Sequence, residues 1–425
     1  MLIAQCMTEA DVARAVRFAT RRDVPIAVRG GGHSIPGHST CEGGIVIDLG
    51  LMRDVLVDPA RARARAQGGC RLADLDRATQ EHGLAVTTGA VSHTGLGGLT
   101  LGGGFGLLMR TYGLTIDNLS AARLVTADGD LVRVAEDCEP ELFWALRGGG
   151  GNFGIVTEFE FRLHRVGPVR SLIQVHPLAD AREVLSVSSR LPERADDRLA
   201  WGHVMREAPD FPWMPRHIVG RRVLLSAFSW LGGDDGDALD EVAASVAAGS
   251  LHDPVFSMTA VQPYVAVQSA WDGLFAPGHG VYSKAALFRE ASDHLIDALV
   301  EQSALARSPL SQIELTAMGG AVARVPDGAT AFPHREAGWV ANVVALWTVG
   351  DPAAGDHVEW VRKTRRAAVA DGCMGTYVNY GDGEAGETDR SYGTARARLG
   401  RVKDIYDPHN RFRLNQNIRP TSYGR

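Results

Sequence analysis

Apolar and polar positions alternate in short stretches along the first part of the chain, which predicts many small elements. Apolar side chains recur at helical spacing from Val12 to Ala19. Thr8 and Asp11 precede them with the spacing of a capping box, so we predict an opening helix that ends at Arg22. Short apolar or alternating runs predict strands at 25–28, 45–49, 55–57, 62–66, 84–86 and 155–163.

The rest of the chain alternates strand and helix patterns over longer stretches. Helices are expected at 72–78, 140–147 and 394–406, and a hairpin is expected over 119–134. Further strands are expected at 223–230, 284–288, 313–316 and 342–348. The segment 87–106 is rich in glycine and is expected to be irregular. These patterns predict an α+β protein with one domain at 1–165, a second at 166–372, and a C-terminal segment at 373–425.

Composition and charge exclude several classes of protein. The 425 residues carry a formal net charge of -6 with both signs mixed, so no basic stripe indicates a nucleic-acid partner. No apolar run reaches the roughly 18 residues that span a bilayer, and the first residues do not have the pattern of a signal peptide. The 5 cysteines lie far apart and are expected to be reduced thiols. We expect a cytoplasmic protein that is a monomer or a homodimer and does not associate with membranes.

Glycine is the unusual component, because the 49 glycines include three dense clusters, at 30–32, 95–106 and 148–154. Backbone amides in such loops can bind phosphate without cationic side chains, so the clusters favour a dinucleotide pyrophosphate. The alternative is that these glycines only serve tight turns. Gly149, Gly151 and Gly154 have dinucleotide-fingerprint spacing, but the expected helix precedes them and the strand follows, the reverse of a Rossmann unit.

One histidine stands directly after a glycine cluster. His33 follows Gly32, where its ring has little local steric protection and can meet a ligand on the loop. The alternative is a loop histidine without a function, which is the interpretation we give to His38, His82 and His93. No set of three histidines has metal-ligand spacing, so no metal site is predicted.

The chain resembles a known family along nearly its whole length. The matching stretches are VRGGGHS at 28–34, GIVIDL at 44–49, GLGGLTLGGGFG at 95–106, YGLTIDN at 112–118, ELFWALRGGGGNFGIVTE at 141–158 and YDPHNRFRLNQNI at 406–418. In this order they resemble the FAD-linked oxidases of the berberine-bridge-enzyme and 6-hydroxy-D-nicotine oxidase group. The resemblance implies an FAD-binding fold of the vanillyl-alcohol-oxidase (PCMH) type over 1–165. It also implies a substrate-binding domain of antiparallel sheet backed by helices over 166–372, and a segment at 373–425 that returns to the FAD domain.

The resemblance also implies how FAD is held. His33 is expected to bond the 8-methyl carbon of the flavin, which raises the flavin potential. Some relatives add a cysteinyl bond at the position that aligns with Val91, and no cysteine stands there, so a single link is expected. The residues expected to contact FAD are Arg29, Gly30, Gly31, Gly32, His33, Ser34, Gly37, Gly89, Ala90, Thr94, Gly95, Gly98, Leu99, Gly102, Tyr112, Gly113, Asp117, Gly150, Asn152, Gly154, Ile155, Val156, Asn415 and Asn417. The alternative for Arg29 is an exposed strand end, and for Asn415 a side chain that only satisfies backbone groups.

Catalytic residues are expected in the segment Tyr377-Val-Asn-Tyr380, from which this family often takes a tyrosine base. If the segment is extended, Tyr377 and Asn379 point to one face and Tyr380 to the other. We expect Tyr377 to be the base and assign Asn379 and Tyr380 to the same site. The alternative is that both tyrosines only line a pocket.

The expected reaction is hydride transfer from an alcohol carbon of a sugar or natural product, or from an amine carbon, to the flavin, with dioxygen as second substrate and hydrogen peroxide as product. A flavin-dependent cyclase or desaturase of secondary metabolism and a flavin-binding protein without catalysis are the alternatives. By the same resemblance, Arg324 stands where plant relatives have an acidic base, which counts against the plant chemistry. Relatives commonly have valine at the oxygen-access position, whereas this chain has Thr94 there. A dehydrogenase is therefore a further alternative to an oxidase. The family pattern also has a segment before Leu2, which the chain is expected to lack.

Overall fold

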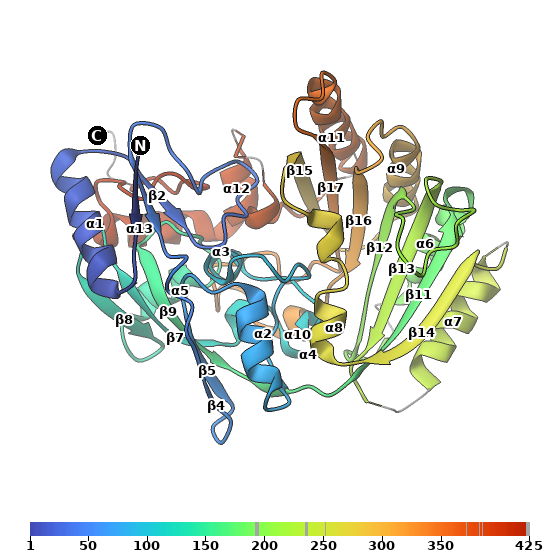
Figure 1. The fold of residues 1–425 in the computed structure, drawn as a ribbon, viewed down its shortest axis with the longest axis horizontal. Coiled ribbons are helices and arrows are strands. Elements are labelled where there is room, and N and C mark those ends of the chain that lie inside the picture. Colours follow the sequence, from blue (N-terminus) through green and yellow to red (C-terminus); the bar gives the residue numbers. More distant parts are fainter. Residues whose placement is uncertain are drawn as a thin grey trace. The chain divides into compact units, whose positions relative to one another are not determined.

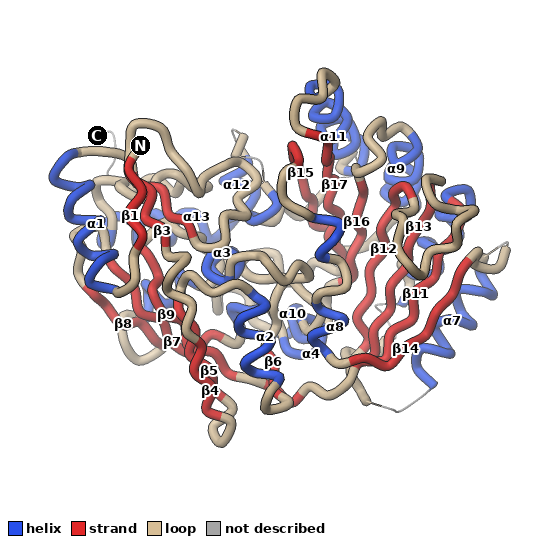
Figure 2. Tube along the Cα trace, viewed as in Figure 1, coloured by secondary structure: helices blue, strands red, loops and turns tan. Residues whose placement is uncertain are grey.

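The computed structural model describes residues 1–191, 195–233, 237–250, 252–370, 372–381, 383–384 and 386–421. Contacts between residues divide the chain into two compact units. Unit 1 comprises Met1–Val166, Val325–Arg335 and Gly383–Arg425, and unit 2 comprises Gly167–Arg324 and Glu336–Asp382. Figures 1 and 2 show the elements of each unit, and each unit is described by itself.

Helix α1 (Glu9–Arg22) shows how local sequence sets an element in unit 1. The Thr8 hydroxyl accepts the backbone N–H of Asp11 at 3.2 Å, and the Asp11 carboxylate accepts the N–H of Thr8 at 2.9 Å, which is the predicted capping box. The apolar face of the helix, including Val12 and Val16, is buried against a core that contains Ile47. The sequence therefore determines both the start of this helix and the face that it buries.

Unit 1 contains three small sheets and several short helices. A parallel sheet has the order β1-β3-β2, an antiparallel sheet has the order β4-β5-β9-β7-β8, and β6 pairs with β10. The strands are β1 (Leu2–Gln5), β2 (Ile26–Arg29), β3 (Ile45–Asp48), β4 (Val55–Asp58), β5 (Arg63–Gln67), β6 (Leu84–Ala85), β7 (Leu119–Val125), β8 (Leu131–Ala135), β9 (Ile155–Arg162) and β10 (His164–Arg165). The helices after α1 are α2 (Leu72–Gln80), α3 (Leu96–Gly102), α4 (Met109–Tyr112), α5 (Pro140–Leu146), α12 (Glu387–Tyr392) and α13 (Arg396–Tyr406), and η1 (Thr115–Asp117) is a 3₁₀ turn.

Unit 2 is built on one seven-stranded antiparallel sheet with the order β14-β11-β13-β12-β16-β17-β15. Figure 2 shows α6, α7, α9 and α11 gathered on one side of this sheet, and their apolar residues share one core with it. The strands are β11 (Val169–Pro177), β12 (Leu199–Glu207), β13 (Arg222–Trp230), β14 (Phe256–Gln262), β15 (His279–Phe288), β16 (Gln312–Ala317) and β17 (Trp339–Thr348). The helices are α6 (Ala181–Ser188), α7 (Asp237–Gly249), α8 (Tyr264–Gln268), α9 (Asp293–Ala304), α10 (Ala321–Arg324) and α11 (Ala354–Ala368). The predicted α+β fold with a helix-backed antiparallel sheet is confirmed.

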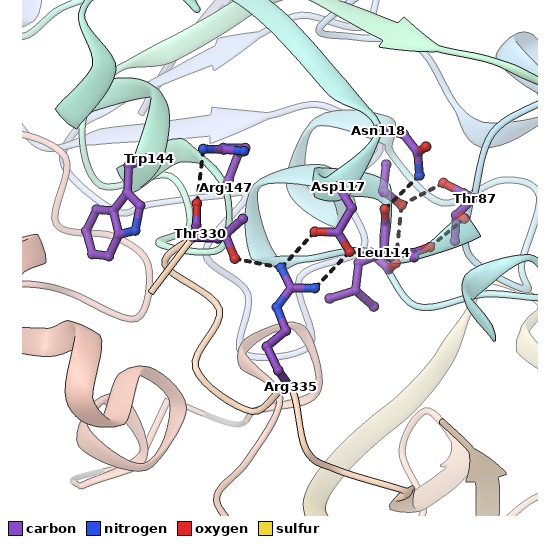
Figure 3. A network of polar contacts seen from close by, with 12 residues as sticks. Thr87, Leu114, Asp117, Asn118, Trp144, Arg147, Thr330 and Arg335 are labelled. Carbon is purple, nitrogen blue, oxygen red and sulfur yellow. Dashed lines mark hydrogen bonds and ion pairs between the residues drawn. The ribbon is translucent and has the colours of Figure 1, made fainter. Parts of the chain in front are cut away.

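The unit boundaries differ from the predicted domains at two places. The segment Val325–Arg335 lies in unit 1, although the prediction placed it in the second domain. The Arg335 guanidinium donates two hydrogen bonds of 2.7 and 2.8 Å to Asp117 and one of 2.6 Å to the Thr330 hydroxyl (Figure 3). This bidentate pair is buried, with the two side chains 2% and 9% exposed, and such pairs have strong geometric preferences. It therefore fixes the segment to unit 1.

The second difference concerns the start of the C-terminal segment. The prediction began that segment at residue 373, whereas the chain leaves unit 2 only after Asp382. Backbone hydrogen bonds of 2.8 and 3.0 Å join Leu287 of β15 to Met374 and Gly375, and they hold this stretch on the sheet of unit 2. The segment 87–106 is also not wholly irregular, because it contains α3.

Several classes of feature are absent from the described part of the chain. No helix there is both long and apolar enough to cross a membrane. Within the same ranges, no group of three or more His, Cys, Asp or Glu side chains has the arrangement of a metal site. The cysteines Cys6, Cys41, Cys70, Cys138 and Cys373 are free, in agreement with the prediction of unpaired thiols.

A buried ion pair fastens the C-terminal part of unit 1. Lys403 of α13 and Asp407 are both fully buried, and their charged atoms lie 2.6 Å apart. The Lys403 ammonium also donates to the carbonyl oxygens of Asn152 at 2.6 Å and Phe412 at 2.9 Å. The Asp407 carboxylate accepts the backbone N–H groups of Arg411 and Phe412. One lysine therefore joins the glycine-rich loop after α5 to the segment that follows α13.

We expect Lys403→Met to destabilise the protein by about 3 to 5 kcal/mol, because it leaves the Asp407 carboxylate buried without its cation. The matched control is Lys363→Met at an exposed position of α11, which we expect to change stability by less than about 0.5 kcal/mol. Urea denaturation followed by tryptophan fluorescence measures both. Equal denaturation midpoints for the two variants would show that the pair contributes nothing to stability.

Candidate functional site

Two glycine loops of unit 1 touch through their backbones. A Cβ atom added to Gly31 would overlap the backbone nitrogen of Gly95, and a Cβ added to Gly95 would overlap that of Gly31. Only glycine allows this approach at both positions. The contact places the loop after β2 against the loop that leads into α3.

The contact brings two histidines together. The Nε2 atom of His33 lies 2.8 Å from the Nδ1 atom of His93. Partial burial of the His33 ring, the His93 ring and the Arg71 cation together lower the pKa of His33 to about 4. His33 is therefore neutral at physiological pH, and a neutral imidazole can act as a nucleophile.

The loop that carries His93 is held by backbone hydrogen bonds to the start of α2. The N–H of Leu72 donates to Thr94 at 3.0 Å, and the N–H of Ala73 donates to Ser92 at 2.9 Å. Thr94 thus contributes its carbonyl to the frame of the loop. Ala90 lies exposed on the same loop, and a Cβ on Gly89 would overlap the Leu99 side chain.

Helix α3 lies within the second glycine cluster, and its end contacts the third cluster. A Cβ built on Gly98 meets no atom within 4 Å, so this exposed position leaves open space beside the helix. At the end of the helix, the N–H of Gly150 donates to the Leu101 carbonyl at 2.9 Å. Gly151 also has open space around the position of a Cβ. The predicted clusters therefore meet around α3, with Gly102 buried as its last residue.

The C-terminal segment of unit 1 closes on the third cluster. Asn415 donates its side-chain amide to the carbonyl of Gly151 at 3.0 Å. The side-chain oxygens of Asn415 and Asn417 are buried, and neither has a hydrogen-bond partner among the residues that the structure describes. Buried acceptors without partners are rare in folded proteins and point to a missing donor. Both asparagines thus have a free acceptor for a ligand.

Other predicted FAD contacts are engaged by the fold itself. Asn152 is fully buried, donates to Gly149 at 2.9 Å, and accepts the N–H of Ile418 at 3.0 Å. Asp117 accepts two bonds from Arg335 and the N–H of Leu114 at 2.8 Å (Figure 3). These partners explain both side chains without a cofactor. Both side chains therefore hold the frame of the site, and their contact with FAD stays a prediction.

Tyr112 and Gly113 also have structural partners. The Tyr112 ring stacks on His164 with ring centroids 3.9 Å apart, and its hydroxyl donates to the Arg165 carbonyl at 3.3 Å. Gly113 has a φ of 80°, and a Cβ there would crowd the Asp117 carboxylate. Both residues shape the turn before η1.

The remaining predicted residues lie on the strands and loops that border the glycine clusters. The guanidinium of Arg29, at the end of β2, lies 3.7 Å from the Asp48 carboxylate. The Ser34 carbonyl accepts the N–H of Gly37 at 3.0 Å, which closes the turn after His33. Gly30 lies beside the carbonyl of Gly68. Gly32, Gly154, Ile155 and Val156 complete the set, with the last two buried in β9.

The predicted catalytic segment lies in unit 2 and is not extended. Residues Val378–Tyr380 form the 3₁₀ turn η5, with Tyr377 as its first flanking residue. The expected alternation of faces is therefore wrong, and the rings of Tyr377 and Tyr380 meet edge to face with centroids 4.9 Å apart. The Asn379 amide donates to the Tyr377 hydroxyl at 2.9 Å. The turn gathers all three residues into one cluster.

A polar row that the sequence analysis missed crosses the sheet of unit 2. Glu314 of β16 accepts the side-chain amides of Gln312 at 2.6 Å and Asn342 at 3.0 Å. Beyond them, Arg206 donates to Gln312 at 2.7 Å and Ser283 donates to Asn342 at 2.7 Å. Burial raises the pKa of Glu314, and burial with the Glu314 charge raises the pKa of Tyr380. Tyr380 is therefore a poor base.

Two further residues of unit 1 were missed for different reasons. The sequence gives His93 no distinguishing pattern, although it lies between the expected FAD contacts Ala90 and Thr94. Gly68 was not singled out because it stands outside the three clusters. The Gly68 carbonyl lies close to the Cβ positions of both Gly30 and Gly97. The backbone of Gly68 therefore contacts both of the first two glycine clusters.

Comparisons with known proteins agree with this arrangement. Residues 1–135 match the family described as FAD binding domain, and residues 376–419 match the family described as berberine and berberine like. The chain is 34% identical over 435 residues to (R)-6-hydroxynicotine oxidase of Paenarthrobacter nicotinovorans, which covers 99% of this chain and 91% of that protein.

Solved structures confirm the fold. The crystal structure of 6-hydroxy-D-nicotine oxidase from Arthrobacter nicotinovorans matches with a TM-score of 0.85 and 29% identity, over 98% of this chain and 92% of that chain. Glucooligosaccharide oxidase from Acremonium strictum, an enzyme with a 6-S-cysteinyl, 8α-N1-histidyl FAD, matches with a TM-score of 0.84 and 24% identity, over 99% and 92% of the two chains. The expected two-domain architecture is therefore shared with flavoproteins of known structure.

We expect Gly31→Ala and Gly95→Ala each to cost about 1 to 3 kcal/mol of stability, because the new methyl group meets backbone that cannot give way. Gly98→Ala is the matched control, since its methyl group enters open space and alanine is favoured in a helix by about 0.5 to 1 kcal/mol. Urea denaturation of the three purified variants separates these effects. Equal stability of all three would contradict the backbone contact.

Proposed function

Because the chain belongs to the family of FAD-linked oxidoreductases that includes 6-hydroxynicotine oxidase and the berberine-bridge-like proteins, and is thereby an FAD-dependent oxidoreductase, we propose that it carries FAD on His33 and oxidises an alcohol or amine. The observation that supports this most directly is the convergence of the glycine clusters of unit 1 around α3, with a neutral His33 at one end. The substrate is a small molecule.

The residues of unit 1 fit FAD on three counts. Gly98 and Gly151 leave open space where side chains would otherwise stand, as a pyrophosphate needs for close approach to backbone amides. The side-chain oxygens of Asn415 and Asn417 can accept N–H groups of the flavin ring. His33 has an imidazole that is neutral near pH 7 because its pKa is about 4.

We propose a single covalent link. The position that aligns with the cysteine of doubly linked relatives is Val91, which cannot form a thioether. The link to His33 retains the cofactor and raises its potential. In this respect the protein differs from the glucooligosaccharide oxidase described above.

The catalytic base in the proposal is Tyr377. When bound, FAD supplies a hydride acceptor at N5 and passes the electron pair to dioxygen, which yields hydrogen peroxide. Tyr377 takes the proton of the substrate hydroxyl or amine as the hydride leaves. To take this proton Tyr377 enters the step as its phenolate, and the Asn379 amide, which donates to the Tyr377 oxygen, stabilises that anionic form. Tyr380 packs against Tyr377 and orients its ring.

We expect His33→Ala to abolish covalent attachment of FAD, because it removes the only nucleophile that the proposal assigns. The measurement is the intact mass of acid-denatured protein together with its visible absorbance. Wild type should be yellow and heavier by one FAD, and so should His38→Ala, the matched control in the same loop. A wild-type protein with the mass of the bare chain would contradict covalent attachment.

We expect Tyr377→Phe to lower kcat by about 10²- to 10⁴-fold, the usual contribution of a general base, while the flavin content stays that of wild type. Tyr380→Phe is the control and should lower kcat by less than tenfold. The substrate is taken from a screen of oligosaccharides and 6-hydroxynicotine for compounds that bleach the flavin under anaerobic conditions, and peroxide release is then measured. If the Tyr380 variant is the slower one, Tyr377 is not the base.

A further inference from the structure

The hydroxyl of Tyr392, the last residue of α12, contacts two separate segments of unit 1. It lies 3.2 Å from the Gly149 carbonyl, in the third glycine cluster, and 3.4 Å from the Gln416 carbonyl, in the segment after α13. A phenol has one proton, so the two carbonyls share it. The side-chain amide of Asn152 donates to the same hydroxyl at 3.4 Å. One hydroxyl therefore joins the third glycine cluster to the C-terminal segment.

The surroundings of Tyr392 keep its hydroxyl protonated and in place. The side chain is 1% exposed, and this burial raises the pKa of Tyr392, so the hydroxyl remains a donor near neutral pH. A Cβ added to Gly150 would lie 3.0 Å from the hydroxyl oxygen, and Gly150 has a φ of 70°. A residue with a side chain would be strained at this position and would crowd the phenol. The glycine cluster is therefore shaped to accept Tyr392.

A third segment fixes the backbone just before Tyr392. The Nε2 atom of His334 lies 3.1 Å from the carbonyl oxygens of Arg390 and Ser391, so this nitrogen carries a proton and donates it to them. The next residue, Arg335, fastens the same segment to unit 1 through its buried ion pair. The position of Tyr392 is therefore set from outside the glycine cluster and the C-terminal segment that its hydroxyl joins.

Two contacts hold the backbone on either side of Asn417. The Gln416 carbonyl faces the Tyr392 hydroxyl, and the N–H of Ile418 donates to the side-chain oxygen of Asn152 at 3.0 Å. The side-chain oxygen of Asn417 is buried and has no hydrogen-bond partner among the residues that the structure describes. Buried acceptors without a donor are rare in folded proteins. Asn417 is therefore held in place with an acceptor that a ligand N–H can occupy.

We propose that Tyr392 is a positioning residue for FAD: its hydroxyl fixes the backbone beside Asn417, so that the Asn417 side-chain oxygen accepts an N–H group of the flavin. The inference rests on the proposed binding of FAD to unit 1. Without the hydroxyl, the Gly149 carbonyl still accepts the Asn152 amide at 2.9 Å, whereas the Gln416 carbonyl keeps only a 3.4 Å contact with that amide. Loss of the hydroxyl therefore loosens the segment that carries Asn417 more than the glycine cluster.

The test measures FAD affinity in a protein that lacks the proposed covalent link. The His33→Ala protein is stripped of flavin in concentrated potassium bromide, and the dissociation constant of FAD is determined from the change in FAD fluorescence. Adding Tyr392→Phe should raise this constant by about five- to tenfold, the contribution of a single hydrogen bond. The matched control is Tyr406→Phe, which removes a hydroxyl that bonds Glu139 and should change the constant by less than about twofold. Far-UV circular dichroism shows that each flavin-free protein is folded.

A double-mutant cycle separates positioning from a merely structural role. Asn417→Ala removes the acceptor, so it should itself weaken FAD binding, and adding Tyr392→Phe to it should have an effect of less than about twofold. The same loss of affinity from Tyr392→Phe with and without Asn417 overturns the inference. Unchanged affinity after either single substitution also overturns it and leaves the proposed function intact.

The proposed function fails by a different result, which is that neither wild type nor His33→Ala binds FAD. If wild type carries covalent FAD but His33→Ala binds FAD too weakly to measure, the comparison uses proteins that retain His33. The fraction that carries covalent FAD after a fixed exposure to FAD should then fall in Tyr392→Phe and stay at the wild-type value in Tyr406→Phe. Equal fractions in all three proteins overturn the inference.

Discussion

The contact between the backbones of Gly31 and Gly95 is the constraint on which the site in unit 1 depends. Neither position has room for a Cβ, so the loop after β2 and the loop before α3 approach as closely as two peptide chains can. This approach brings His33 and His93 into hydrogen-bond distance. Helix α3, which belongs to the second glycine cluster, contacts the third cluster through the bond from Gly150 to Leu101.

The rest of unit 1 holds this arrangement in place with buried polar groups. Lys403 joins the Asn152 carbonyl to the C-terminal segment, and Arg335 joins Asp117 to the segment Val325–Arg335. Buried charges are costly unless they are paired and hydrogen-bonded, so such pairs fix a specific geometry. The side-chain oxygens of Asn415 and Asn417 are buried beside the third glycine cluster and have no hydrogen-bond partner among the residues that the structure describes. A bound flavin would complete them.

Sequence reasoning succeeded where a local pattern determines the structure. The capping box at Thr8 and Asp11 predicted the start of α1, and the reversed order of helix and strand around Gly149 and Gly154 correctly excluded a Rossmann unit. It failed where contacts between distant residues decide. Nothing in the local sequence predicts that Asp117 pairs with Arg335, which is 218 positions away. The segment from Tyr377 to Tyr380 alternates like a strand, yet packing of the two rings accompanies a 3₁₀ turn. Nothing in the local sequence distinguishes His93 from other loop histidines, because only the fold brings it close to His33.

The proposed function requires that unit 1 binds FAD and links it to His33. The most direct test is to digest the purified wild-type protein with trypsin and to locate the flavin by tandem mass spectrometry. Cleavage after Arg29 and Arg53 releases the peptide 30–53, which contains His33, His38 and Cys41. We expect one FAD on this peptide, with fragment ions that assign it to His33. A flavin on any other residue, or flavin recovered only as free FAD, would disprove the link to His33.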